Sequence, residues 1–177
     1  MPEVPCPEVA ALFEREANTF ATIVLFQDDG FARMAMDSEF SIKVPMRTAK
    51  KFGASVYAGI REYVRRSDKA CAAIILNPCT FRPDIGYVAP VRRTEFSPLF
   101  KAQFGDLKLP LELTSVDEMM RFVPLGGRRM ARPDTCALTD LNGSIQEFVG
   151  EGFATPYNIF VLIHARATLR RRIVIGS

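Results

Sequence analysis

The chain has 177 residues, of which 48% are hydrophobic and 24% are charged, and its net charge is +3. This composition is close to the globular average and excludes a disordered or collagen-like chain. No apolar run approaches the roughly 20 residues needed to span a bilayer, so we expect no membrane partner. The first residues also lack the basic and apolar regions of a secretory signal, which makes a cytoplasmic location the expectation.

The charge is unevenly distributed along the chain. Residues 1–42 carry eight acidic and two basic side chains, whereas residues 43–69 carry eight basic and two acidic ones, so the net charges are −6 and +6. The remaining residues, 70–177, carry +3. Such asymmetry indicates parts with different partners. The basic segment is expected either to attract nucleic acid or an acidic protein surface, or to form a solvated helix face against the acidic first segment.

Residues 7–27 are predicted to form an amphipathic helix. Pro7 suits a first helical turn, and the apolar side chains recur at spacings of three and four residues. That stripe consists of Phe13, Ala17, Phe20, Ala21, Val24 and Leu25. The sequence Asp28-Asp29-Gly30 interrupts the pattern, and residues 31–36 resume it as a short helix or turn.

Residues 43–67 are predicted to form two helices joined by a tight turn. Gly53 can adopt the left-handed conformation that ends a helix, and Ser55 can cap the next one. This order of helix, glycine turn, serine cap and helix is typical of a helix-turn-helix.

From residue 70 onwards the pattern changes to short strands. Residues 72–76, 87–96, 158–164 and 172–175 are predicted to be extended. A capping box at Ser115–Glu118 predicts a short helix over residues 116–122. Gly126-Gly127 and Asn142-Gly143 are turn signals, the second typical of a hairpin.

These elements predict an α+β protein. Its N-terminal helices, with the helix-turn-helix-like pair, form a first region over residues 1–69. A mostly antiparallel β-sheet module forms a second region over residues 70–177.

The cysteines and the histidine are expected to have structural roles, whereas two pairs of arginines are candidates for ligand binding. The four cysteines are scattered without a C-x-x-C pair, so we expect small buried apolar residues rather than zinc ligands. His164 is the one histidine and falls within a predicted strand, where we expect a hydrogen-bonded side chain. The paired arginines at 92–93 and 128–129 are candidates for lining a pocket for an anionic ligand.

Two segments resemble the ImmA/IrrE-type zinc metallopeptidases. Residues 14–21, EREANTFA, are similar to the E-x-x-A-N-x-F-A helix of that family. Residues 49–61, AKKFGASVYAGIR, resemble its later A-x-x-F-x-V-S-x-x-A helix-turn-helix. The two blocks occur in the family's order and together cover about residues 8–67. Long members continue into a GAF-like sensor module, which the resemblance places at residues 70–177.

The resemblance implies a metal ligand in a complete family member but no cofactor in this chain. Glu14 matches the family's third zinc ligand, and Asn18 lies one helical turn later as its supporting amide. The family's H-E-x-x-H motif is absent, since a single histidine is present. A zinc peptidase needs two histidines and a glutamate base, so we expect no peptidase activity. We expect a fragment, a truncated form or a degenerate relative that begins after the catalytic helix.

These observations predict the regulatory or sensing portion of an ImmA/IrrE-type transcription regulator. Its β-rich module would bind a small-molecule ligand or a protein, and the resemblance implies a repressor as partner. One alternative is a DNA-binding protein that uses Lys50, Lys51, Ser55, Tyr57 and Arg61 of the helix-turn-helix. Another alternative is a piece of a complete zinc metallopeptidase that cleaves a repressor.

Overall fold

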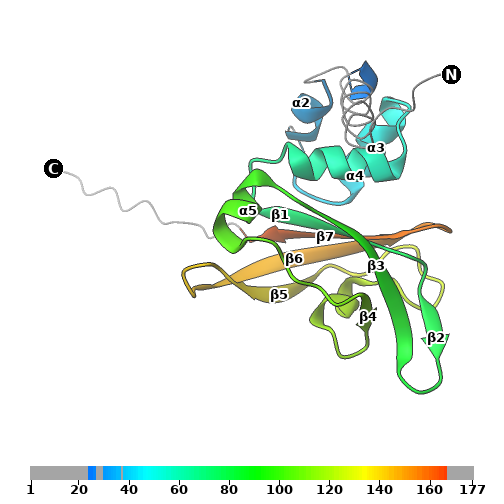
Figure 1. Ribbon diagram of the computed structural model, residues 1–177. Helices are drawn as coiled ribbons and strands as arrows, with labels where there is room; N and C mark the ends of the chain where they lie inside the picture. Colours follow the sequence, from blue (N-terminus) through cyan, green and yellow to red (C-terminus); the bar gives the residue numbers. More distant parts are fainter. Residues whose placement is uncertain (1–23, 27–29, 37, 167–177) are drawn as a thin grey trace, which may run out of the picture. The chain divides into compact units, whose positions relative to one another are not determined.

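The computed structural model describes residues 24–26, 30–36 and 38–166 (Figure 1). The chain divides into two compact units, Met1–Tyr63 and Val64–Ser177. The boundary that the sequence predicts between a helical region and a β-sheet module, at residues 69 and 70, stays a prediction. Most of the predicted helix at 7–27 and all of the predicted strand at 172–175 lie outside the described residues. Within the described ranges, no helix has the length and apolar character required to cross a membrane.

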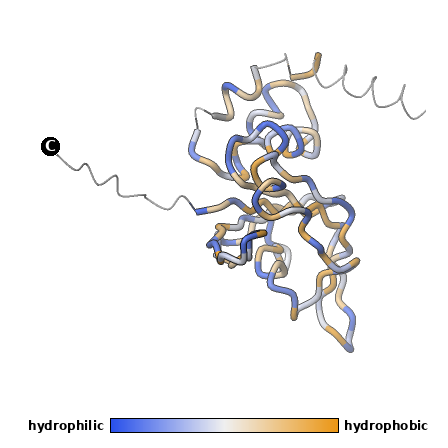
Figure 2. Tube along the Cα trace, turned by 60° about the vertical axis from the view of Figure 1, so that its left-hand side comes forward, coloured by the Kyte–Doolittle hydropathy of each residue, from blue (hydrophilic) through white to orange (hydrophobic). Residues whose placement is uncertain are grey.

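The first unit is helical. It contains α2 (Gly30–Met36), α3 (Lys43–Lys51) and most of α4 (Val56–Arg65), which agrees with the predicted short helix and helix pair. Both hydrophilic and hydrophobic residues occur along this part of the trace (Figure 2), and α3 buries residues at spacings of three and four, as an amphipathic helix requires. Its core includes three phenylalanine rings at centroid distances of 4.6–6.4 Å, from Phe26, Phe31 and Phe52.

The second unit is built on an antiparallel sheet that curls along its length (Figure 1). Its described strands follow the order β2-β3-β1-β7-β6-β5, and β4 pairs with β3 beside this path. The strands are β1 (Cys71–Leu76), β2 (Thr80–Arg82), β3 (Gly86–Phe96), β4 (Glu112–Thr114), β5 (Asp134–Thr139), β6 (Ile145–Ala154) and β7 (Ile159–Ala165). The described residues therefore confirm an α+β chain with an antiparallel sheet.

The centre of the sheet is the apolar strand β1. All six of its residues are buried, and it pairs with β3 on one side and β7 on the other. Alternate residues Ala72, Ile74 and Leu76 belong to the hydrophobic core of the unit, together with Phe148 of β6. A continuous apolar run of this length is typical of a strand that is covered on both faces, which explains why it was recognisable.

Two short helices accompany the sheet. The helix α5 (Pro98–Phe104) was not predicted, although Ser97 and Pro98 form a serine cap followed by a first-turn proline. The Ser97 hydroxyl accepts hydrogen bonds from the backbone N–H groups of Phe100 and Cys71, each at 3.1 Å, and donates one to the Lys69 carbonyl at 2.7 Å. This buried hydroxyl therefore ties the start of α5 to the start of β1.

The predicted capping box at Ser115–Glu118 is wrong. The second helix, η1, is a 3-10 helix over Glu118–Phe122, and no side chain caps it. The carboxylate of Asp117 instead accepts hydrogen bonds from the backbone N–H and hydroxyl of Thr114, at 2.7 and 2.8 Å. Ser115 directs its hydroxyl to the Ile85 carbonyl at 3.4 Å. Because Asp117 is engaged by Thr114 and Ser115 is directed to the distant Ile85, neither side chain caps the helix, which starts later than predicted.

The hairpin predicted at Asn142-Gly143 is confirmed. Gly143 has a φ of 83°, and the turn joins β5 to β6. The Asp140 carboxylate accepts hydrogen bonds from the N–H groups of Asn142 and Ser144 at 2.9 and 2.8 Å. An acidic side chain that folds back onto its own turn in this way fixes the register of the two strands.

Candidate functional sites

The turn between α3 and α4 has the hydrogen bonds of a Schellman motif. The Ala54 N–H donates to the Ala49 carbonyl at 2.9 Å, and the Gly53 N–H donates to the Lys50 carbonyl at 3.3 Å. Gly53 has a φ of 66°, the left-handed conformation that this motif requires. The Ser55 hydroxyl then accepts the Ala58 N–H at 3.1 Å as the cap of α4. The glycine and serine thus act locally as predicted.

The two helices approach each other closely at Gly59. A Cβ atom at this position would lie 2.5 Å from the Cβ of Ala49 and 2.9 Å from the Pro45 carbonyl oxygen. Such distances are well below van der Waals contact, so glycine is required for the helices to meet here. The pair is therefore a fixed structural unit rather than two independent helices.

The predicted DNA-binding residues occupy both sides of this turn. Lys50 and Lys51 are exposed in the last turn of α3. Ser55 is exposed at the start of α4 and its hydroxyl is engaged as the helix cap. Arg61 lies over the ring of Tyr57, with its Cζ atom 5.5 Å from the ring centroid. The structure thus places two lysines and one stacked arginine near the same turn.

The zinc site that the resemblance implies would include two residues of the N-terminal segment. Glu14 and Asn18, the implied zinc ligand and its supporting amide, lie outside the described residues. Among residues 24–26, 30–36 and 38–166, no three His, Cys, Asp or Glu side chains are grouped so that they could hold a metal ion. The donor set for zinc is incomplete because the sequence has one histidine, so the residues present do not fit a catalytic zinc site.

His164 lies in β7 with a partly buried ring. Its Nδ1 atom is 3.3 Å from the Ala165 carbonyl oxygen, in agreement with a hydrogen-bonded strand histidine. Burial, the largest effect, lowers the pKa of His164 below its usual value of 6.5. The ring is therefore mainly neutral at neutral pH, and its position within the sheet is that of a structural residue.

The cysteines described by the structure are free thiols. Cys71 and Cys136 are buried, Cys79 is partly buried, and Cys6 lies outside the described residues. Burial raises the pKa of all three described thiols, and that of Cys136 to about 11. Because the thiolate is the nucleophile, these side chains are poor candidates for covalent chemistry.

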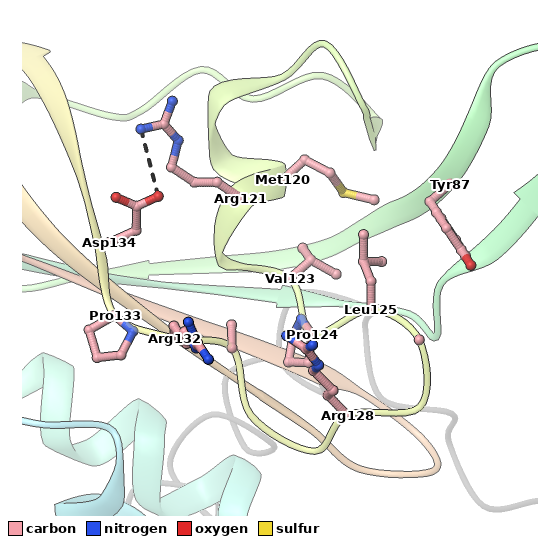
Figure 3. Close-up of a pocket in the computed structure, with 12 residues that line it drawn as sticks. Tyr87, Met120, Arg121, Val123, Pro124, Leu125, Arg128, Arg132, Pro133 and Asp134 are labelled. Atoms are coloured by element: carbon pink, nitrogen blue, oxygen red, sulfur yellow. Dashed lines mark ion pairs between the residues drawn. The ribbon is translucent and has the colours of Figure 1, made fainter.

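The second unit contains an open cleft beside η1, which we call the arginine cleft (Figure 3). Its volume is about 720 Å³. It is formed by β3, η1, the loop that follows η1, and the start of β5. Its lining residues are Tyr87, Met120, Arg121, Val123, Pro124, Leu125, Gly126, Arg128, Ala131, Arg132, Pro133 and Asp134.

The arginine cleft has an apolar floor and a charged rim. Met120 and Val123 are 5% and 4% exposed, Pro124 is buried, and Leu125 is partly buried. Tyr87 contributes an exposed aromatic ring from β3, and the Met120 side chain extends toward it (Figure 3). A floor of this kind favours the apolar part of a ligand, because contact removes apolar surface from water.

One of the three rim arginines is held in place by the protein. Arg121 donates a hydrogen bond from Nη1 to the Thr135 carbonyl at 2.8 Å. It also forms ion pairs of 4.0 Å with Glu118 and Asp134. Asp134 is the one carboxylate that lines the cleft, and it is engaged by Arg121 and by the N–H of Thr135.

The other two rim arginines have no such partners. Within the described part of the chain, the guanidinium groups of Arg128 and Arg132 form no hydrogen bond or ion pair, and both side chains are exposed. The loop that carries them contains two glycines of positive φ, Gly126 and Gly127. The cleft therefore presents two uncompensated positive charges next to an apolar floor.

Two glycines of β6 fix the position of η1. A Cβ atom at Gly150 would lie 2.6 Å from two ring atoms of Phe122, and one at Gly152 would overlap the Phe122 carbonyl oxygen. Phe122 is fully buried, ends η1 and lies between the cleft residues Arg121 and Val123. The loop that follows is held against β6 by a hydrogen bond of 3.0 Å from the Ala131 N–H to the Gly152 carbonyl. The glycines of β6 thus position the cleft.

The predicted arginine pairs separate in the structure. Arg92 donates a hydrogen bond to the Asn158 side chain at 2.9 Å, and Arg93 forms an ion pair of 2.8 Å with Glu95. Neither lines the cleft, whereas Arg128 does. Tyr87, Arg121 and Arg132 also line the cleft and were not predicted, since they form no motif and Tyr87 is distant from the other two in the sequence. No protein family and no curated protein matches this chain.

Proposed function

We propose that this chain is the regulatory portion of an ImmA/IrrE-type transcription regulator, and that its second unit is a GAF-like sensor module for a small ligand. The arginine cleft is the observation that carries the proposal. Small-molecule sites are typically concave, mostly apolar and about 300–1,000 Å³ in volume, with a few placed polar groups. The cleft, at about 720 Å³ with a buried apolar floor and three arginines among its lining residues, agrees with this range of volumes and with the requirement for placed polar groups.

The proposed activity is binding rather than catalysis. The chain lacks the histidine pair of a zinc peptidase, and the cleft holds no histidine or cysteine among its lining residues. A ligand that binds the folded second unit stabilises it by mass action. The proposed target of this regulation is a repressor protein, the partner that the resemblance implies.

A cleft-filling substitution tests the proposal. Ala131 lines the cleft, so a phenyl ring at this position would occupy it. Ala137 is exposed on β5 outside the cleft and provides a matched control. A library of small molecules should contain compounds that raise the melting temperature of the wild type and of Ala137→Phe but not of Ala131→Phe. Compounds that stabilise all three proteins equally, or none that stabilise any, would contradict ligand binding in the cleft.

A second candidate function is DNA binding through α3 and α4 as a helix-turn-helix. The Schellman turn and the Ser55 cap favour it, because they fix the second helix directly after the first. Lys50 and Lys51 supply positive charge for phosphates, and Arg61 stands one helical turn after Tyr57. Ala54, Val56 and Ala58 offer no groups that read base edges, so binding would depend mainly on the phosphate backbone.

The salt dependence of binding to duplex DNA tests this candidate. The triple variant Lys50→Ala, Lys51→Ala, Arg61→Ala removes three positive charges, and each phosphate contact contributes about 0.9 to the slope of log K against log salt. We therefore expect a slope reduced by about 3 units. A charge-matched control changes three cationic side chains of the second unit: Lys101, Lys108 and Arg129. Identical DNA binding by the two triple variants would exclude α3 and α4 as the interface.

A further inference from the structure

We infer that the arginine cleft selects a small organic oxyanion, a carboxylate or phosphate monoester, that carries a flat apolar body. This inference rests on the proposed ligand-binding function and names the chemical class of the ligand. It follows from two properties of the cleft: the positive charge of its rim, which favours an anionic head group, and its apolar floor, which favours a flat apolar body.

The charge of the rim points to an anionic head group. The carboxylate of Asp134 is engaged by Arg121, so it does not neutralise the other two arginines. Arg128 and Arg132 have no protein partner in the described part of the chain. Guanidinium groups bind carboxylates and phosphates through paired hydrogen bonds, and such charge-assisted bonds are roughly twice as strong as neutral ones. A cationic ligand would instead be repelled.

The floor and wall point to a flat apolar body. The buried side chains of Met120 and Val123 and the partly buried Leu125 cannot bond to a polar ligand. The Tyr87 ring, 40% exposed, offers a face for stacking, and the Met120 thioether extends toward it (Figure 3). Aromatic and thioether groups contact flat rings favourably. An inorganic anion would satisfy the arginines but would leave the exposed Tyr87 ring in water.

A set of related probes separates the two properties. 2-Naphthoate and 2-naphthyl phosphate combine a flat body with an anionic head. 2-Naphthamide keeps the body without the charge, and inorganic phosphate keeps the charge without the body. We expect both naphthyl anions to bind the full chain about tenfold or more tightly than 2-naphthamide, since hydrogen bonds to charged groups are stronger. The tighter of the two anions identifies the head group.

Adjacent arginines provide a matched pair of variants. Arg128→Ala removes a cleft arginine, whereas Arg129→Ala removes its exposed neighbour, which does not line the cleft. Titration calorimetry should show naphthoate affinity reduced about tenfold or more in Arg128→Ala and in Arg132→Ala. The affinity of Arg129→Ala should stay within about twofold of the wild type, because distant exposed charges are screened by salt.

The outcomes distinguish this inference from the proposed function. Equal binding of 2-naphthoate and 2-naphthamide, each blocked by Ala131→Phe, would overturn the anionic head and leave ligand binding in place. Equal binding of 2-naphthoate and inorganic phosphate would overturn the apolar body. Equal losses in Arg128→Ala and Arg129→Ala would show that long-range charge, rather than the cleft, binds the probe. Binding of no small molecule in the wider library would overturn the proposed function itself.

Discussion

The contact between β6 and η1 allows a stability prediction that follows directly from geometry. A Cβ atom at Gly150 would lie 2.6 Å from the Cδ1 and Cζ atoms of Phe122. Carbon atoms prefer separations of about 3.5–4.0 Å, so Gly150→Ala must push the ring and the strand apart by about 1 Å. Phe122 is fully buried, so the shift must displace side chains that pack around its ring.

The magnitude is the balance of two effects. Overpacking a core costs about 1–3 kcal/mol, whereas replacing glycine by alanine where φ permits it stabilises by about 0.4–1 kcal/mol through the unfolded chain. Gly150 is not among the glycines with positive φ, so the second effect applies. We expect the free energy of unfolding to fall by about 1–2 kcal/mol. For a protein of this size, this lowers the melting temperature by roughly 2–8 °C.

A double-mutant cycle with Phe122→Ala provides the assay. Phe122→Ala alone should destabilise by about 3–5 kcal/mol, because it leaves a cavity in the core. In the double variant, the new methyl group of Gly150→Ala enters that cavity, so the two effects should be non-additive by at least about 0.5 kcal/mol. Urea unfolding followed by circular dichroism measures all four proteins. An additive double variant, or Gly150→Ala at wild-type stability, would refute the contact.

Three further predictions concern protonation and ion pairing. Burial lowers the pKa of His164 in the folded state. As the pH falls below about 6.5, the unfolded chain therefore binds a proton first, and stability declines until the folded pKa is reached. Urea unfolding between about pH 7.5 and 5.5 should show this loss in the wild type and not in His164→Asn; equal pH dependence would contradict it. The pKa of Cys136 is raised to about 11, so iodoacetamide at mildly alkaline pH should modify Cys79 before Cys136, and mass spectrometry that finds Cys136 modified before Cys79 would contradict its burial. Arg82 and Glu112 form a bidentate ion pair at 3.0 and 2.9 Å, but both side chains are more than one-third exposed. Glu112→Gln should therefore change the free energy of unfolding by less than about 1 kcal/mol, and a larger loss in urea unfolding would show that screening is weaker than expected.

Local chemistry explains which elements were predictable from the sequence. Gly53 and Ser55 determine the α3–α4 turn through bonds to residues at most five positions away, so the pattern contained the whole interaction. The run at Cys71–Leu76 is buried on both faces, and its composition alone indicated a strand. The same local reasoning failed at Ser115, because its hydroxyl is directed to Ile85, thirty positions earlier in the chain.

The sequence indicated Arg128 as a candidate for an anionic pocket, but it could not indicate the whole arginine cleft, because Tyr87 reaches residues 120–134 through long-range placement. Tyr87 comes from β3, Arg121 from η1, and Arg132 from the loop before β5. The sequence around an arginine does not tell whether its side chain will reach the cleft. Arg121 lines the cleft, whereas Arg92 donates a hydrogen bond to Asn158. The decisive contact is that of Phe122 with the glycines of β6, and nothing near Gly150 in the sequence indicates its partner.

Steric substitutions at two glycines can separate the functions proposed for the two units. Gly152→Ala would overlap the Phe122 carbonyl oxygen in the second unit, and Gly59→Ala would meet Ala49 in the first. Because the clash at Gly152 displaces the residues that precede the arginine cleft, Gly152→Ala should weaken 2-naphthoate binding without changing DNA binding. Gly59→Ala should do the reverse, since it separates α3 from α4.

Each variant thus serves as the control for the other, and circular dichroism verifies that both remain folded. If either substitution weakened both kinds of binding equally while the protein stayed folded, the two activities would share one site. The assignment of ligand binding to the second unit and of DNA binding to α3 and α4 would then be wrong. A reciprocal loss would instead assign each activity to the unit whose packing had been changed, because the two clashes involve separate sets of atoms.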